Sequence, residues 1–195
     1  LEPVEQLTDL AMSVSGINVD LYRRRLELIK PNVQDLESLA IAYFEQRSEH
    51  CEHVISILKQ LGKAVYIISA GNTPAVPLFA RRLGVNDANV LAVSLSFDDQ
   101  GEYIGFDDAS LLVQPTGKFD LVRLIRKKHD LKSIALIGDG MNDLPAIDAV
   151  ELFIGYGGHQ YREKVEQKAE HYIMDSSFYS LLPLLLTTDE LNKLD

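Results

Sequence analysis

The sequence contains one cysteine, an excess of acidic over basic residues and no long apolar run. The single Cys51 has no partner for an internal disulfide, so nothing indicates an oxidising compartment. The longest leucine-rich run, LLPLLL at 181–186, is far shorter than the roughly 20 residues that cross a bilayer. The formal net charge of -10 argues against general nucleic-acid binding, which needs clustered Lys and Arg. We therefore expect a cytoplasmic protein without membrane or nucleic-acid partners, and a small-molecule ligand.

The overall composition is that of a globular protein. Its 195 residues are 46% hydrophobic and 25% charged, which favours one core with a small appendage. The first residue is Leu1 rather than Met, so we expect the numbered sequence to begin inside a longer product. The oligomeric state, monomer or homodimer, stays open.

The sequence divides into two regions that differ in the spacing of their apolar residues. Residues 1–48 predict a helical module, because apolar residues recur at helical spacing in 4–12, 19–29 and 33–44. In the second of these helices we expect Leu21, Leu28 and Ile29 to face inward. Residues 49–195 then alternate between helical segments and β-branched runs.

The alternation in residues 49–195 predicts the fold class. We expect strands at 64–69, 90–95, 133–138, 152–156 and 171–174, and a hairpin around the Asp-Asp-Gln-Gly turn. Helices between successive strands imply a mostly parallel sheet covered by helices, an α/β Rossmann-like core. Ligands of such sheets sit beyond the carboxyl ends of the strands.

The first polar cluster at a predicted strand end is SAGNTP, residues 69–74. Ser69 and the backbone N–H groups of Ala70 and Gly71 form a candidate anion-binding site before a helix. The alternative is a plain strand-to-helix turn with Thr73 as the N-cap.

Lys118 lies in the first turn of a predicted helix. A cation there opposes the helix dipole and is mildly unfavourable unless an anion is nearby. Taken alone, an ordinary solvated surface lysine is the better explanation.

The third cluster is GDGMND, residues 138–143, directly after an apolar strand. Asn142 and Asp143 are explained as helix N-caps. Asp139, flanked by glycines, is not, and carboxylates gathered at a strand end are what Mg²⁺ coordination requires. The pattern favours a functional site over a capping turn.

In this order, Ser69, Lys118 and Asp139 with Asp143 resemble the second, third and fourth motifs of the haloacid dehalogenase superfamily. Residues 51–180 look like its phosphoserine phosphatase branch, and residues 1–48 resemble the helical cap of that branch. The resemblance implies a haloacid-dehalogenase-like core at 49–195 and hydrolysis of a small phosphorylated metabolite through an aspartyl-phosphate.

The resemblance also implies roles for single residues. Asp139 would bind Mg²⁺, and Asp143 would order the metal's water shell or Lys118. Ser69, Ala70 and Gly71 would hold phosphate oxygens, Lys118 would neutralise phosphoryl charge, and Asn142 would lie near the phosphate. In the cap, the positions that contact the amino-acid part of the substrate are Met12 and Arg25; Ser13 stands where the family usually has glycine.

The family's nucleophile motif, Asp-x-Asp-x-Thr or Val, is missing from the 195 residues. We expect it upstream of Leu1, because loss of its strand would remove the centre of the sheet. Two alternatives remain: a non-catalytic sensor of phosphoryl ligands on the same fold, and the phosphorylation domain of an ion-pumping ATPase, which the lack of a spanning segment disfavours.

Two other patterns are weaker. His50, Cys51 and His53 lack the paired spacing of a zinc site, and we interpret them as a solvated helix start. The glycine pair in FIGYGGHQYRE, residues 153–163, lacks the order of a dinucleotide-binding loop.

Overall fold

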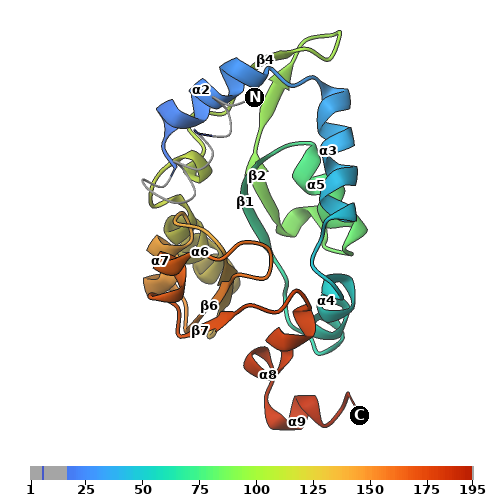
Figure 1. Cartoon of the computed structure of the whole chain (residues 1–195), viewed down its shortest axis with the longest axis vertical. Helices are drawn as coiled ribbons and strands as arrows, with labels where there is room; N and C mark the ends of the chain where they lie inside the picture. The colour runs from blue at the N-terminus through green and yellow to red at the C-terminus, as the bar shows by residue number, and fades with distance from the viewer. Residues whose placement is uncertain (1–5, 7–16, 195) are drawn as a thin grey trace.

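The computed structural model describes Gln6 and residues 17–194, and apart from Gln6 the helix expected at 4–12 lies outside them (Figure 1). The helices are α2 (Val19–Ile29), α3 (Val33–Glu45), α4 (Cys51–Gln60), α5 (Ala75–Arg82), α6 (Gly117–His129), α7 (Glu163–Glu166), α8 (Leu182–Leu185) and α9 (Thr188–Leu191). The strands are β1 (Ile67–Asn72), β2 (Val90–Val93), β3 (Leu95–Phe97), β4 (Tyr103–Phe106), β5 (Ala135–Gly138), β6 (Leu152–Tyr156) and β7 (His171–Ile173). Short 3-10 turns are η2 (Asp87–Asn89), η3 (Leu111–Val113), η4 (Leu144–Ala149) and η5 (Phe178–Leu181).

The predicted α/β class is confirmed by the pairing of the strands. β1 runs parallel to β2, and β5, β6 and β7 form a second parallel sheet in that order. β3 and β4 form the expected antiparallel hairpin, which projects at one end of the molecule (Figure 1). Parallel strands require crossover connections, and α5 and η4 are two of the elements that supply them.

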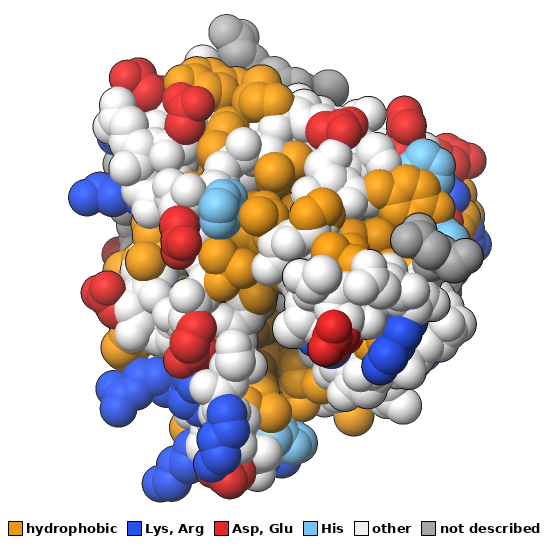
Figure 2. Space-filling model, turned by 90° about the horizontal axis from the view of Figure 1, so that it is seen from below, with side chains coloured by type: hydrophobic (Ala, Val, Ile, Leu, Met, Phe, Trp, Pro, Cys, Tyr) orange, Lys and Arg blue, Asp and Glu red, His pale blue; other side chains and the backbone are white. Residues whose placement is uncertain are grey.

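The two parallel sheets are not joined to each other. Among the residues that the structure describes, β1 is paired only with β2, and β5 only with β6. Side chains of both strands stay partly exposed, including Ile67, Ile68, Leu136 and Ile137. Seen from below, hydrophobic side chains gather in a furrow between two bulges of the surface (Figure 2). Each of the two strands therefore has one edge that can accept a further strand.

Helix α2 buries Leu21 as expected, but it does not bury Leu28 and Ile29. It begins at Asn18, whose side chain accepts a hydrogen bond from the Leu21 backbone N–H, and it buries Leu21, Tyr22 and Leu26. The expectation for Leu28 and Ile29 is wrong, since their side chains are 55% and 47% exposed. Leu28 and Ile29 lie in the last turn of α2, beyond Leu26, which is the last buried residue of the helix.

The N-terminal helices share a core with the first sheet. Tyr22 and Leu26 of α2 and Leu36 of α3 belong to one buried cluster with Ala75 and Val93. Each of the buried Leu and Val side chains contributes roughly 1.5–3 kcal/mol through burial. No helix in the described part of the chain is both long enough and apolar enough to cross a membrane.

Several element boundaries differ from the expected ones. β1 begins at Ile67 and runs through Asn72, because its ladder with β2 extends to the Asn72–Val93 pair. The SAGN segment is therefore the end of a strand rather than a loop. The helix expected after Asp143 is the 3-10 turn η4, with Pro145 in its first turn. The expected strand at 90–95 is divided into β2 and β3.

Candidate active site

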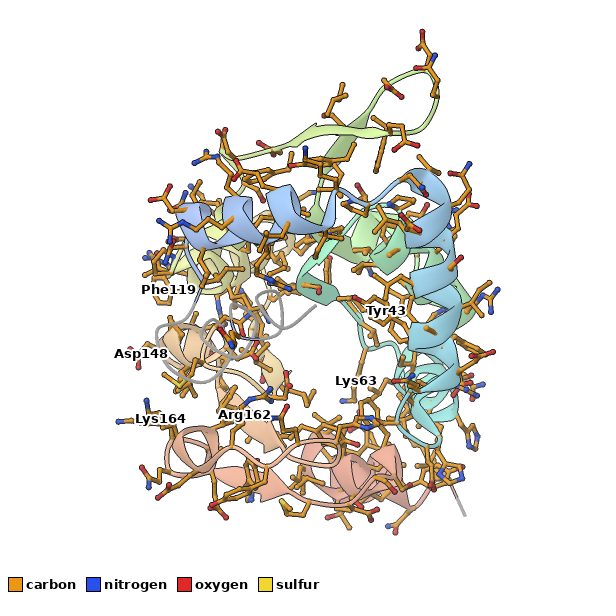
Figure 3. All side chains as sticks on the ribbon, turned by 45° about the horizontal axis from the view of Figure 1, so that its top comes forward. Tyr43, Lys63, Phe119, Asp148, Arg162 and Lys164 are labelled. Carbon is orange, nitrogen blue, oxygen red and sulfur yellow. The ribbon has the colours of Figure 1, made fainter. Side chains whose placement is uncertain are left out.

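The site is built at the carboxyl ends of the parallel strands, where the loops after β5 and β6 come together. Asp139 follows β5 directly, and Arg162 ends the loop that follows β6. β5 and β6 are parallel and in register from Ala135–Leu152 to Gly138–Gly155, so both loops leave the same edge of the sheet. Figure 3 shows Arg162 lying inward, toward the middle of the molecule, whereas Lys164 lies at its edge.

The innermost charges are Lys118 and Asp143. The Lys118 Nζ lies 2.5 Å from the Asp143 Oδ1, and the two side chains are 14% and 3% exposed. The backbone N–H of Gly140 donates to the Asp143 Oδ2 at 3.0 Å, so both carboxylate oxygens have partners. Asp143 makes no capping bond to η4. The capping explanation of this residue therefore fails, and Lys118 is not an ordinary surface lysine.

Gly138 makes room for this arrangement. A Cβ added at Gly138 would lie 2.5 Å from the Asp143 Cβ and Cγ, a separation that real Cβ atoms essentially never show. Because Gly138 has no side chain, the Asp143 side chain can lie against the end of β5 and reach Lys118.

Asp139 is placed differently from Asp143. Its side chain is 52% exposed, and its Oδ2 accepts a hydrogen bond from the Arg162 Nη1 at 2.8 Å. The same Nη1 donates to the Asp139 carbonyl oxygen at 2.9 Å, and the Arg162 side chain is only 11% exposed. Arg162 was missed by the sequence analysis. The signal that would have found it is its place in the loop after a parallel strand neighbouring that of Asp139.

The end of β1 carries the predicted phosphate-binding residues. Ser69 Oγ accepts a hydrogen bond from the Gly71 backbone N–H at 2.9 Å, so that N–H is engaged by the serine itself. Thr73 is not the N-cap of α5: the helix begins after Pro74, and Thr73 Oγ1 accepts from the Leu95 N–H. This capping alternative is therefore wrong, although the role of Ser69 stays a prediction.

Tyr22 connects helix α2 with the end of β1. Its hydroxyl donates to the Ala70 carbonyl oxygen at 3.0 Å and also contacts the Asn72 Oδ1. Burial raises the pKa of the Tyr22 phenol well above its usual range, and the nearby Arg25 charge opposes this rise in pKa. The phenol therefore stays protonated and available as a donor at any working pH.

Three buried side-chain polar atoms lack a hydrogen-bond partner in the described part of the chain. They are Arg25 Nε, Asn142 Oδ1 and Arg162 Nε. Buried polar atoms are nearly always paired in native proteins, and exceptions need an explanation. Two of these residues flank Asp139, and Arg25 lies one turn beyond Tyr22 on α2. Each of these atoms is therefore a candidate contact for a polar ligand.

The hydrogen bonds join the predicted site residues in separate pairs. Lys118 contacts Asp143, Ser69 contacts Gly71, and Asp139 contacts Arg162, which had not been predicted. Met12 lies outside the described residues. The histidines of the weaker candidate, His50 and His53, instead pack against the ring of Tyr179.

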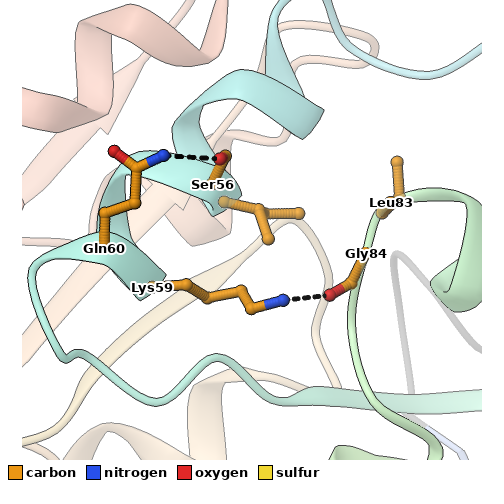
Figure 4. A pocket seen from close by; sticks show the side chains of 6 residues that line it. Ser56, Lys59, Gln60, Leu83 and Gly84 are labelled. Carbon is orange, nitrogen blue, oxygen red and sulfur yellow. Dashed lines mark hydrogen bonds between the residues drawn. The ribbon is translucent and has the colours of Figure 1, made fainter.

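A separate surface hollow lies at the opposite edge of the sheet. It has a volume of about 370 Å³ and is lined by α4 and the end of α5, with Lys59 Nζ donating to the Gly84 carbonyl oxygen at 2.6 Å (Figure 4). The end of α4 precedes the start of β1, and the end of α5 precedes the start of β2. This hollow is therefore near the amino ends of the strands and is not part of the site.

Comparison with known proteins identifies the family. No family model matches the sequence. The phosphoserine phosphatase of Bos taurus is 31% identical over 184 residues, which cover 94% of this chain and 81% of the relative. That of Drosophila melanogaster is 34% identical over 173 residues, 88% of this chain and 64% of the relative. The chain belongs to the phosphoserine phosphatase family.

A solved structure agrees with this membership at the level of the fold. A substrate-bound phosphoserine phosphatase superimposes with a TM-score of 0.79 at 22% identity, covering 94% of this chain and 84% of the other. The haloacid-dehalogenase-like fold expected from the motifs is confirmed. Membership of this family identifies the chain as a phosphatase and disfavours the non-catalytic sensor.

Proposed function

We propose that the full-length protein is a Mg²⁺-dependent phosphomonoesterase that acts on a small phospho-amino acid. The observation that carries this proposal is the set of three unpartnered buried atoms, on Arg25, Asn142 and Arg162, around the strand ends. Two guanidinium donors and an amide oxygen suit an anionic substrate with a carboxylate and a hydrated cation.

The phosphate would be held between β1 and α6. Ser69 Oγ and the backbone N–H groups of Ala70 and Gly71 would donate to phosphate oxygens, which requires Gly71 to exchange its bond with Ser69 for one to the ligand. Lys118 would neutralise the charge that builds up on the phosphoryl group. Its contact with the buried Asp143 fixes the ammonium group in place before the substrate arrives.

The residues after β5 fit a hard cation. No group of three or more His, Cys, Asp or Glu side chains in the described residues is suited to a metal. The half-exposed carboxylate of Asp139 and the unpartnered Oδ1 of Asn142 are nonetheless hard oxygen atoms of the kind that Mg²⁺ and its water shell prefer. Asp139 would hold the ion, which would supply positive charge beside the phosphoryl oxygens. Arg162 would then release Asp139 and turn toward the substrate.

The attacking group would be an aspartate of the family's first motif, which the 195 residues do not contain. The free edges of β1 and β5 support a position for its strand between them. This aspartate would displace the alcohol from phosphorus, the second aspartate of the motif would protonate the leaving oxygen, and water would hydrolyse the aspartyl-phosphate.

Residues 1–48 would form a cap over a core of residues 49–195. In support, α2 contacts the end of β1 through Tyr22, and the α2–α3 turn bonds to the β3–β4 hairpin, where the Val33 N–H donates to the Gly101 carbonyl oxygen at 3.0 Å. Arg25 would face the substrate's carboxylate, and closure would exclude water during transfer.

The experiment is a turnover screen of the full-length protein against phosphomonoesters, with Mg²⁺ and with excess EDTA. We expect hydrolysis of phosphoserine or a close analogue that EDTA abolishes and Mg²⁺ restores. Tight binding of phosphoserine without turnover would instead support the sensor, and turnover that is indifferent to EDTA would contradict the metal assignment.

A further inference from the structure

The starting observation is the contact between Tyr22 and Asn72. Tyr22 is 3% exposed, and its hydroxyl reaches the Asn72 Oδ1 as well as the Ala70 carbonyl oxygen. Its ring packs against Phe106 with centroids 5.2 Å apart, which fixes the position of the phenol. The single phenol proton is shared between these two acceptors, and the contact holds the oxygen of the Asn72 carboxamide toward Tyr22.

Anchoring the oxygen decides where the nitrogen points. A carboxamide is planar and carries an acceptor and a two-proton donor on opposite corners. With Oδ1 on the phenol, the Nδ2 of Asn72 points away from Tyr22, and it donates to no residue in the described part of the chain. Asn72 ends β1, three residues after Ser69 in the segment that we assign to the phosphate. Asn72 Nδ2 is thus a directed donor at the carboxyl end of the strand that carries Ser69.

Tyr22 also links Asn72 to Arg25. The two residues are three apart on α2, so their side chains leave the same face of the helix. The charge of Arg25 acts on both Tyr22 and Tyr43, which places all three side chains in one neighbourhood. Tyr43 reaches from α3 toward the middle of the molecule (Figure 3). Asn72 and Arg25 are therefore both close to the phenol of Tyr22.

We propose that Asn72 is a specificity-determining residue whose Nδ2 donates a hydrogen bond to the carboxylate of the substrate, and that Tyr22 is the positioning residue that holds the amide in this orientation. The proposal rests on the proposed function and narrows its substrate class. A leaving alcohol with a carboxylate near the ester oxygen would be recognised from the core by Asn72 as well as from the cap by Arg25.

The test uses the full-length protein and three substrates. Phosphoserine carries a carboxylate and an ammonium group, phosphoglycolate only the carboxylate, and phosphoethanolamine only the ammonium group. Asn72→Leu keeps the size of the side chain and removes the donor. Tyr22→Phe keeps the ring against Phe106 and removes the anchor. Tyr43→Phe is the matched control, since its hydroxyl makes no hydrogen bond to the described residues.

For Asn72→Leu we expect KM to rise about tenfold or more on both carboxylate substrates, because a hydrogen bond to a charged group is lost. The change on phosphoethanolamine should stay below about twofold. Tyr22→Phe should show the same pattern at about threefold, since the amide is present but no longer oriented. Tyr43→Phe should match the wild type on all three substrates.

Equal losses on all three substrates would overturn the proposal, because Asn72 and Tyr22 would then only support the fold. A loss confined to phosphoethanolamine would also overturn it, since the amide would then present its oxygen to the ammonium group. If the wild-type protein hydrolyses none of the substrates, the proposed function fails. The proposal is then decided by calorimetric binding of phosphoserine, in which Asn72→Leu must weaken affinity and Tyr43→Phe must not.

Discussion

At the scale of single residues, Lys118 and Asp143 stand out because their ion pair is the least exposed of those in the described chain. Removing one partner of a buried pair leaves an uncompensated charge in a poorly solvated place. We expect Lys118→Ala to slow phosphoryl transfer by about a hundredfold or more, since one preorganised charge is worth about 3 kcal/mol. The free energy of unfolding should also fall by about 3–5 kcal/mol. Kinetics and urea denaturation measure the two effects.

A second variant separates these effects. Lys118→Ala combined with Asp143→Asn removes both charges, so part of the lost stability should return while the rate stays low. Recovery of the rate in the double variant, or an unchanged rate in Lys118→Ala, would contradict the assignment of Lys118 to the phosphoryl group.

Asp139 should behave in the opposite way. Its carboxylate is half exposed, and the buried Arg162 keeps its hydrogen bond to the Asp139 carbonyl oxygen in the variant, so Asp139→Asn should change the melting temperature little. Phosphatase activity should nearly disappear, because the variant loses the carboxylate that we assign to the metal. Asp130→Asn is the control, because it removes a carboxylate from another exposed ion pair and should change neither stability nor activity. A large loss of stability with activity intact would refute this assignment.

At the scale of elements, α2 presents three consecutive arginines to three different surroundings. Arg23 pairs with Asp20 and Asp108, Arg24 is exposed, and Arg25 has a buried Nε. We expect Arg25→Ala to lower kcat/KM for phosphoserine by a factor that corresponds to about 2–4 kcal/mol of transition-state stabilisation. The kcat/KM for p-nitrophenyl phosphate, which lacks a carboxylate, should be nearly unchanged. Arg24→Ala should alter neither. Equal losses on both substrates would show that Arg25 supports the packing of α2.

The end of β5 gives the second prediction at this scale. Gly138→Ala would drive a methyl group into the Asp143 side chain, so the strand end or the carboxylate must move. We expect a loss of about 1–3 kcal/mol in the free energy of unfolding and a large fall in activity. Gly105→Ala in β4 is the matched control, because nothing lies within 4 Å of its added Cβ. Equal melting temperatures for the two variants would argue against a clash between the added methyl group and Asp143.

At the scale of the whole molecule, the sequence predicted the order of elements better than their contacts. The bounds of α2 and β6 agree with the pattern because apolar periodicity reports local burial. The extension of β1 to Asn72 could not be predicted, since it depends on pairing with β2 about twenty residues away. Likewise the motifs marked Asp139 and Asp143 as a group, whereas their separate partners, Arg162 and Lys118, come from tertiary packing.

The labelling rate of the buried Cys51 thiol reports on unfolding of the whole molecule. It is 3% exposed within a cluster that includes Ile55, Ala80, Leu83 and Val85, and burial raises the pKa of its thiol to about 11. At pH 8 only about a thousandth of the folded protein then carries the reactive thiolate. We expect iodoacetamide to label Cys51 slowly in the native protein and rapidly above the urea midpoint. Rapid labelling without urea would show that this cluster opens locally.

The two unjoined sheets also have a consequence for amide hydrogen exchange. β6 lies between two parallel neighbours, so its backbone amides bond on both sides and exchange only when the sheet opens. In β1 and β5, the amides that point toward the free edge have no partner strand among the described residues, so we expect them to exchange faster than those of β6. A strand seated between β1 and β5 would slow the exchange of those amides on both strands at once, and the two half-sheets would then open as one cooperative unit.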